Sequence, residues 1–238
     1  MSETFKPNFM VALISALLIL FTACAKDSID ETVKTPAQSS ISYLALGDSY
    51  TIGTSLADEG DSYPVKIADR LNAAGIDCFP PHIIAQNGWT TGDLLNATDA
   101  FSPDSTFDLV SLLIGVNNQY QGKSIDAYAD EFKTLLKRAI QYAGNDTSKV
   151  FVISIPDYSV TPFGSDNAET IAKEIDQFNA VNSEITESYG ISYFYITDIS
   201  RQAANDPELI ASDGLHPSGK MYELWVADFI EEIKMKTR

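Results

Sequence analysis

Short apolar segments alternate with amphipathic ones from residue 41 to the C-terminus. Apolar residues that recur every three or four positions predict four helices, around 63–71, 125–140, 171–185 and 223–233. Between the helices, short apolar runs bounded by turn residues predict five strands, at 42–46, 82–86, 107–114, 149–155 and 191–197. Strands of this kind that alternate with helices indicate an α/β fold, with a parallel sheet covered by helices on both faces.

Ligands of such sheets bind beyond the carboxyl ends of the strands. Residues with reactive or hydrogen-bonding side chains that directly follow a predicted strand are therefore the candidates for a functional site.

The N-terminal segment has a different pattern from the rest of the chain. An apolar run covers 9–23 and ends at Cys24, after which the sequence becomes polar at once. Fifteen residues are too few to span a bilayer comfortably but suit the core of a signal peptide. The segment resembles a bacterial lipoprotein signal, which implies lipidation of Cys24. An ordinary secretory signal with an incidental cysteine is the alternative.

The resulting division of the chain has three parts. We expect a signal peptide at 1–23, a lipid-anchored flexible tether at 24–40 and one globular domain at 41–238. This places the protein in the bacterial cell envelope, exported and anchored to a membrane on its periplasmic or outer side. The chain has two cysteines, so with Cys24 lipidated Cys78 is expected to be a buried apolar residue rather than half of a disulfide.

Composition narrows the possible partners. The 238 residues carry a formal charge of −17. An acidic surface repels phosphate backbones, so we expect no nucleic-acid partner. With 45% hydrophobic residues, the chain after its first two dozen residues is long enough for one domain with its own core.

The first predicted strand leads into Gly47-Asp48-Ser49. A serine where a strand turns into a helix has an exposed hydroxyl, and its own N–H points toward the site. Ser49 is therefore a candidate nucleophile. The alternative is that Asp48 or Ser49 only caps the following helix.

A candidate base lies just before the last predicted helix. A serine hydroxyl needs a base to take its proton as it attacks. The chain has two histidines: His82 lies within a predicted strand and is interpreted as structural, whereas His216 lies in a loop rich in Gly and Pro. Asp213, three residues earlier, can orient the imidazole. The alternative is a simple helix-entry turn at Pro217.

Two more loops follow strands. Asn117, after the strand at 107–114, can stabilise an oxyanion through its amide, or can be an ordinary turn asparagine. The loop at 87–93 contains two glycines that can offer backbone N–H groups.

Taken together, these four segments resemble those of the SGNH (GDSL-type) hydrolases, over essentially the whole of 41–238. The resemblance implies a flavodoxin-like, three-layer α/β/α sandwich with a five-stranded parallel sheet. It implies Ser49, His216 and Asp213 as catalytic residues, and the N–H groups of Ser49 and Gly92 with the Asn117 amide as the oxyanion hole. Gly88 is the alternative to Gly92. Asn118 departs from the family pattern, which usually has a carboxylate there.

The activity implied by the resemblance is ester hydrolysis by two-step acyl transfer, with no metal and no cofactor. The sequence contains no HExxH motif, P-loop or dinucleotide-binding glycine pattern. Aromatic residues near the site are candidates for a substrate wall: Tyr50, Trp89, Tyr120 and Tyr158, with Phe163 in a loop at 156–167 that can act as a lid or wall.

The substrate class stays open at this point. The family acts on acyl lipids, thioesters and acetylated sugars, and the expected substrate is a short-chain or acetyl ester. Because an enzyme tethered outside the cytoplasm often meets polysaccharides, an ester carried by a carbohydrate or polysaccharide is favoured. A lysophospholipid or thioester is the other possibility. A catalytically silent binding lipoprotein and a structural envelope lipoprotein are the alternatives to an enzyme.

Overall fold

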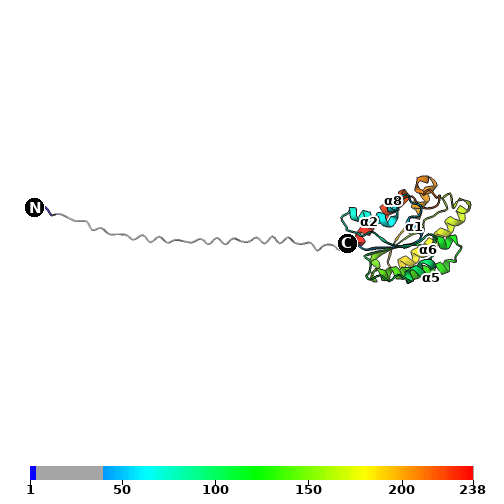
Figure 1. Ribbon diagram of the computed structural model, residues 1–238, viewed down its shortest axis with the longest axis horizontal. Coiled ribbons are helices and arrows are strands. Elements are labelled where there is room, and N and C mark those ends of the chain that lie inside the picture. The colour runs from blue at the N-terminus through cyan, green and yellow to red at the C-terminus, as the bar shows by residue number, and fades with distance from the viewer. Residues whose placement is uncertain (4–39, 238) are drawn as a thin grey trace. The chain divides into compact units, whose positions relative to one another are not determined.

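A computed structural model describes residues 1–3 and 40–237 of the chain (Figure 1). The predicted signal core, Cys24 and all of the predicted tether except Ser40 lie outside the described residues. The described strands are β1 (Tyr43–Gly47), β2 (His82–Ala85), β3 (Leu109–Leu113), β4 (Val150–Ile153) and β5 (Ser192–Phe194). All neighbouring strands are parallel, in the order β2-β1-β3-β4-β5. This is the flavodoxin-like order, so the predicted sheet is confirmed.

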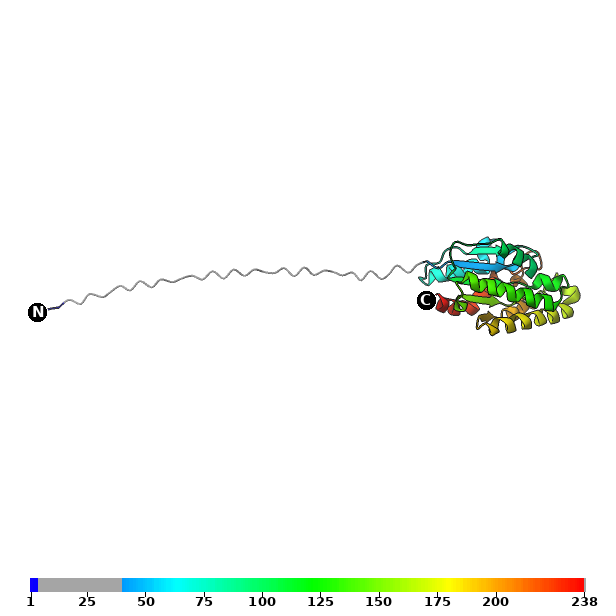
Figure 2. The same ribbon diagram turned by 90° about the horizontal axis from the view of Figure 1, so that it is seen from below.

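Helices cover both faces of this sheet. The α-helices are α1 (Ser49–Ile52), α2 (Tyr63–Ala73), α3 (Thr91–Asp99), α4 (Val116–Tyr120), α5 (Ile125–Tyr142), α6 (Ala168–Ser188), α7 (Thr197–Arg201) and α8 (Gly219–Lys236). Short 3-10 turns occupy Glu59–Asp61, Thr147–Lys149, Ser165–Asn167, Gln202–Ala204 and Pro207–Leu209. Helices α2 and α8 lie on one face, and α5 and α6 lie side by side on the other (Figures 1 and 2). The four long helices match the predicted ones.

No helix among residues 1–3 and 40–237 has the length and apolar character needed to cross a membrane.

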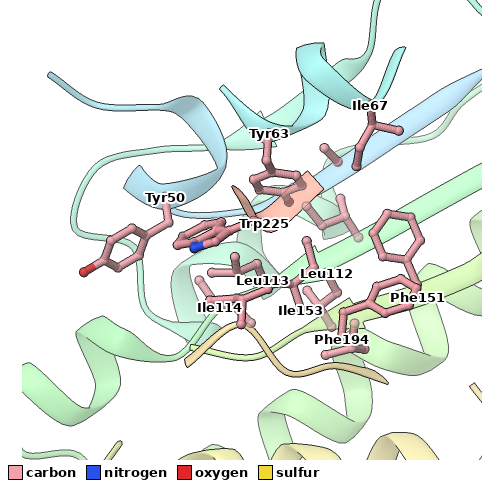
Figure 3. Close-up of a cluster of buried hydrophobic side chains, with 14 of the residues drawn as sticks. Tyr50, Tyr63, Ile67, Leu112, Leu113, Ile114, Phe151, Ile153, Phe194 and Trp225 are labelled. Carbon is pink, nitrogen blue, oxygen red and sulfur yellow. The ribbon is translucent and has the colours of Figure 1, made fainter. Parts of the chain in front are cut away.

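Aromatic side chains fill the core on both sides of the sheet. Beneath α8, Phe151 packs against Phe194 with ring centroids 5.5 Å apart, and Phe194 stacks on Phe229 at 4.6 Å. On the opposite face, Tyr128 of α5 meets Phe178 of α6 at 4.7 Å. Figure 3 shows strand side chains such as Phe151 and Phe194 converging with Tyr63 of α2 and Trp225 of α8 in a buried cluster. Burial of large apolar side chains on both faces is the main stabilising contribution to the fold.

The strand register explains why distant segments meet. Gly47, the last residue of β1, pairs with Ala85 at the end of β2 and with Leu113 at the end of β3. The segments that follow these three strands therefore leave the sheet at the same edge. Three of the four candidate segments begin there.

Candidate active site

The end of β1 turns sharply into α1 and presents Ser49. A Cβ at Gly47 would overlap the Thr51 side chain and the Leu113 carbonyl, so this turn requires glycine. Asp48 caps α1, because its side chain accepts the N–H two residues further on at 3.0 Å. Ser49 is the first residue of the helix. The capping interpretation thus applies to Asp48, and it leaves the Ser49 hydroxyl available.

The loop before α8 holds Asp213 and His216 as a bonded pair. Nδ1 of His216 lies 2.6 Å from Oδ2 of Asp213. The other carboxylate oxygen accepts the backbone N–H groups of Leu215 and His216, each at 3.0 Å. Partial burial acts to raise the pKa of Asp213, but hydrogen bonds from the His216 ring and the loop outweigh it and hold that pKa well below its usual range. An ionised carboxylate only accepts, so it keeps the proton on Nδ1 and leaves Nε2 as an acceptor.

A pocket of about 250 Å³ contains both Ser49 and His216. The His216 ring packs beside Tyr50, with ring centroids 5.6 Å apart. The lining comes from the four candidate segments and the loop after β4: Ser49, Tyr50, Asn87, Gly88, Val116, Asn117, Tyr120, Tyr158, Phe163, Leu215 and His216. Residues separated by most of the chain are therefore neighbours in one concave site, as the strand order requires.

Gly88 and Asn117 bring N–H donors to this pocket. Gly88 turns with a φ of +80°, a conformation that favours glycine. Its N–H, like that of Ser49, donates to no other group in the described part of the chain. Asn117 uses one amide hydrogen to donate to the Trp89 carbonyl at 3.0 Å and keeps the second. Free donors in one pocket with a serine are the parts of an oxyanion hole.

The oxyanion role predicted for Gly92 stays a prediction, with Gly88 as its alternative. Gly92 lies in the first turn of α3 and lines a separate polar hollow beside Glu131. Thr90 and Asp93 bond reciprocally in a capping box, which starts the helix at residue 91. Gly88, the alternative, is the glycine in the pocket. The Thr-x-x-Asp spacing of the capping box is visible in the sequence and could have found this boundary.

Asn118, the departure from the family pattern, is buried behind the pocket. Its Oδ1 accepts the Thr91 N–H at 2.9 Å, and its Nδ2 donates to the Thr91 hydroxyl at 2.6 Å. The asparagine therefore satisfies a free donor at the start of α3.

Three of the four predicted wall residues line the pocket: Tyr50, Tyr120 and Tyr158. Trp89 does not line it, and only the Trp89 carbonyl takes part, as the acceptor of the Asn117 amide. Phe163 joins the wall through its contact with Tyr120, with ring centroids 5.8 Å apart. The loop at 156–167 is thus a wall of the pocket.

The loop at 156–167 is hydrogen-bonded to the loop that holds Asp213 and His216. The Phe163 N–H donates to the Gly214 carbonyl at 3.1 Å, one residue after Asp213. Such a long-range backbone bond has no signal in the sequence.

Asp48 is an ionisable group in the core beside Ser49. Burial raises the pKa of this carboxyl to about 7, although the Tyr50 N–H and its own N–H act to lower it. Its Oδ2 has no hydrogen-bond partner among the described residues. Asp48 therefore changes charge in the neutral pH range, which the sequence alone does not indicate.

The two remaining sequence predictions concern structural residues. His82 stacks on Phe101 with ring centroids 5.0 Å apart and does not line the pocket. Cys78 is buried and forms no disulfide with any residue in the described part of the chain, which does not include Cys24. Both fit the roles predicted for them.

Fold and site together define a class of protein. A serine at the carboxyl edge of a flavodoxin-like sheet, a His–Asp pair in the same pocket and free N–H donors beside them are the components of a serine hydrolase. The chain belongs to the GDSL-like lipase/acylhydrolase family, whose model matches residues 45–224. It is a serine ester hydrolase of the GDSL/SGNH type.

Solved structures of this fold resemble the chain over most of their length. TesA superposes with a TM-score of 0.66 at 15% identity, covering 82% of this chain and 99% of TesA. A lipase/acylhydrolase from Enterococcus faecalis gives 0.65 at 20% identity, covering 82% and 96%. Axe2, an acetylxylan esterase from Geobacillus stearothermophilus, gives 0.62 at 20% identity, covering 81% and 94%. No curated protein sequence matches the chain. At these identities the likeness shows the fold.

Proposed function

We propose that the protein hydrolyses small carboxylic esters, with acetyl or other short acyl groups, including esters carried by carbohydrates. One observation carries the proposal: Ser49 and His216 line the same pocket, with Asp213 bonded to the far nitrogen of the imidazole. This arrangement has a nucleophile, a base and an orienting carboxylate in the order that acyl transfer needs.

The first half of the reaction forms an acyl-enzyme. Ser49 Oγ attacks the ester carbonyl carbon while Nε2 of His216 takes the hydroxyl proton. The N–H groups of Ser49 and Gly88 and the Asn117 amide stabilise the charge that develops on the carbonyl oxygen. The intermediate then loses the alcohol, which receives the proton from His216. The acyl group stays bonded to Ser49.

The second half releases the acid. Water attacks the acyl carbon as His216 takes one of its protons, and the same donors hold the second oxyanion. Collapse of that intermediate breaks the bond to Ser49, which regains its proton from His216. Asp213 stabilises the imidazolium in both halves.

The residues of the pocket wall favour a substrate with a short acyl group and a larger alcohol. Tyr158 is buried, and its hydroxyl donates a hydrogen bond to the Gln119 side chain at 2.8 Å, so the part of Tyr158 that lines the pocket is its apolar ring. Tyr120 and Phe163 stand at the rim with 60% and 51% of their surfaces exposed. A pocket of about 250 Å³ suits a small acyl group, and flat exposed rings outside it suit the apolar face of a sugar. Acetylated xylan, the substrate named for one structural neighbour, is an ester of this kind.

The cellular location is also part of the proposal. The apolar run at 9–23 followed by Cys24 supports export and a lipid anchor in the bacterial cell envelope. Such an anchor would hold the enzyme where polysaccharide esters are found. A Cys24→Ser variant should fail to incorporate radiolabelled palmitate and should leave the membrane fraction. Labelling or membrane association equal to wild type would overturn the anchor.

A panel of esters tests the activity. The full chain is assayed with 4-nitrophenyl acetate, 4-nitrophenyl dodecanoate, acetylated xylo-oligosaccharide, lysophosphatidylcholine and an acyl coenzyme A, with Ser49→Ala as the matched control. We expect the two acetyl esters to be hydrolysed with a higher kcat/KM than the dodecanoate, the lysolipid or the thioester. A preference for the dodecanoate, the lysolipid or the thioester would overturn the substrate class. Binding without turnover of any ester would favour the silent binding lipoprotein.

A further inference from the structure

Two adjacent asparagines hold one segment of backbone behind the pocket. Asn117 donates to the Trp89 carbonyl, and Asn118 bonds both the N–H and the hydroxyl of Thr91. The segment from Trp89 to Thr91 directly follows Gly88. Its position relative to α4 therefore sets the distance between the Gly88 N–H and the Asn117 amide.

The side-chain bonds behind this segment have a fixed direction. A threonine hydroxyl has one hydrogen to donate. Thr91 gives its hydrogen to the carboxylate of Glu131 on α5, and it accepts from the amide Nδ2 of Asn118. The chain of donors thus runs from Asn118 through Thr91 to Glu131. Only a donor at position 118 is compatible with a carboxylate at position 131.

We propose that Asn118, Thr91 and Glu131 form a positioning network for the oxyanion hole, in which the carboxylate at 131 requires a hydrogen-bond donor at 118. The inference rests on the proposed esterase activity. It also gives a physical reason for the asparagine where the family usually has a carboxylate: here the carboxylate of the network is on α5.

Reversing the donor direction tests this dependence. Asn118→Asp places a second acceptor beside the single Thr91 hydrogen and brings two carboxylates together, which disfavours the bonded arrangement. We expect kcat for 4-nitrophenyl acetate to fall about tenfold or more, because a small displacement of a catalytic donor is costly. KM should stay within about twofold of wild type, since the oxyanion forms only during the reaction.

The double variant is the decisive test of the proposed network. In Asn118→Asp/Glu131→Gln, the glutamine amide donates to Thr91 and Thr91 donates to the new aspartate, so the network is restored in the opposite direction. We expect kcat to recover to within about threefold of wild type. Glu131→Gln alone keeps an acceptor for the Thr91 hydrogen and should stay near wild type. A residue that only stabilised the fold would show no such rescue of kcat.

Arg138→Met is the matched control for loosened packing of α3 on α5. Arg138 bonds the Leu95 carbonyl and the Thr98 hydroxyl, farther along the same two helices. The Arg138→Met variant should have a lower melting temperature than wild type and an unchanged kcat.

All variants are assayed as full chains, at a temperature well below the melting point of each. An Asn118→Asp chain with the kcat of wild type, or a double variant no better than Asn118→Asp, would overturn the network. Should Asn118→Asp fail to fold, Thr91→Val replaces it: it removes the hydroxyl and keeps the N–H, so a kcat equal to wild type would equally overturn the proposal. A wild-type chain without esterase activity would instead contradict the proposed function.

Discussion

Nδ1 of His216 lies 2.6 Å from Oδ2 of Asp213, and the other oxygen of that carboxylate accepts two backbone N–H groups of the same loop. The carboxylate therefore fixes the loop and the tautomer of the imidazole at once. Because Nδ1 carries its proton toward Asp213, Nε2 is left to take the proton of Ser49 in the shared pocket.

Replacing Asp213 by Asn should separate these two roles. The Asn oxygen still accepts the loop N–H groups, but its amide now donates toward Nδ1 and favours the tautomer with the proton on Nε2. That tautomer cannot act as the base, so kcat should fall by a factor on the order of 10²–10⁴. Steady-state kinetics measure it. Asp206→Asn, which removes a surface carboxylate paired with Lys220, is the control and should keep the wild-type kcat. Full activity of Asp213→Asn would exclude the orienting role.

Truncating Asn117 should cost turnover rather than substrate affinity. Asn117→Ala removes one oxyanion donor, which is worth about 10²–10³ in kcat. It also removes the bond to the Trp89 carbonyl. Kinetics with 4-nitrophenyl acetate and a thermal melt measure both effects. An unchanged kcat would remove Asn117 from the oxyanion hole.

The two glycines after β2 give a direct comparison. Gly88→Ala forces a side chain onto a φ of +80° within the pocket, so we expect kcat to fall at least tenfold. Gly92 lies in the first turn of α3, where a Cβ would approach the Glu131 side chain no closer than 3.4 Å. Gly92→Ala should therefore keep kcat within about twofold. If the Gly92 variant lost turnover and the Gly88 variant kept it, Gly92 rather than Gly88 would be the oxyanion donor.

The buried Asp48 should make stability depend on pH. The folded state raises its pKa to about 7, so between about pH 4 and pH 7 the folded chain binds more protons than the unfolded chain. The free energy of unfolding therefore falls as pH rises through this range. Asp48→Asn cannot ionise and keeps an acceptor for the helix N–H. Relative to wild type, it should gain stability on going from pH 5 to pH 8.5, by about 2 kcal/mol or more.

Urea denaturation at the two pH values measures that gain. Asp104→Asn, at an exposed loop position, makes the same chemical change outside the core and is the control. An equal gain in both variants, or a gain that shrinks as pH rises, would contradict the role of Asp48.

The aromatic residues at the rim should affect binding of the alcohol part of the substrate and not the rate of acyl transfer. Tyr120→Ala and Phe163→Ala each remove an exposed ring at the pocket edge. We expect KM for acetylated xylo-oligosaccharide to rise roughly 2- to 10-fold, with kcat for 4-nitrophenyl acetate nearly unchanged. Tyr120→Phe keeps the ring and should keep the wild-type KM. Equal KM values for all three variants would argue against stacking at the rim.

Much of the fold could be predicted because its signals are local. Buried strands appear as short apolar runs, and the long helices show their apolar stripe, so β3 and α5 are visible in the sequence. Parallel strands that end in register then bring the segments after β1, β2 and β3 to one edge. The meeting of Ser49 and Asn117 follows from that geometry.

Other features of the site depend on tertiary contacts. The capping box that starts α3 is visible in the sequence, but which of Gly88 and Gly92 lines the pocket with Ser49 depends on how this loop packs against α4. The tie from Phe163 to Gly214 and the bonds from Asn118 through Thr91 to Glu131 join residues far apart in the chain. No periodicity or spacing encodes such pairs.

Covalent labelling measures the central claim most directly. The full chain and its Ser49→Ala variant are treated with a serine-reactive aryl phosphonate, analysed by mass spectrometry, and assayed with 4-nitrophenyl acetate. We predict one phosphonyl group on the wild-type peptide that contains residue 49, none on the variant, and loss of ester hydrolysis in both the labelled chain and the variant. Hydrolysis by Ser49→Ala at the wild-type rate, or a label on another residue that abolishes activity, would contradict the assignment of the nucleophile.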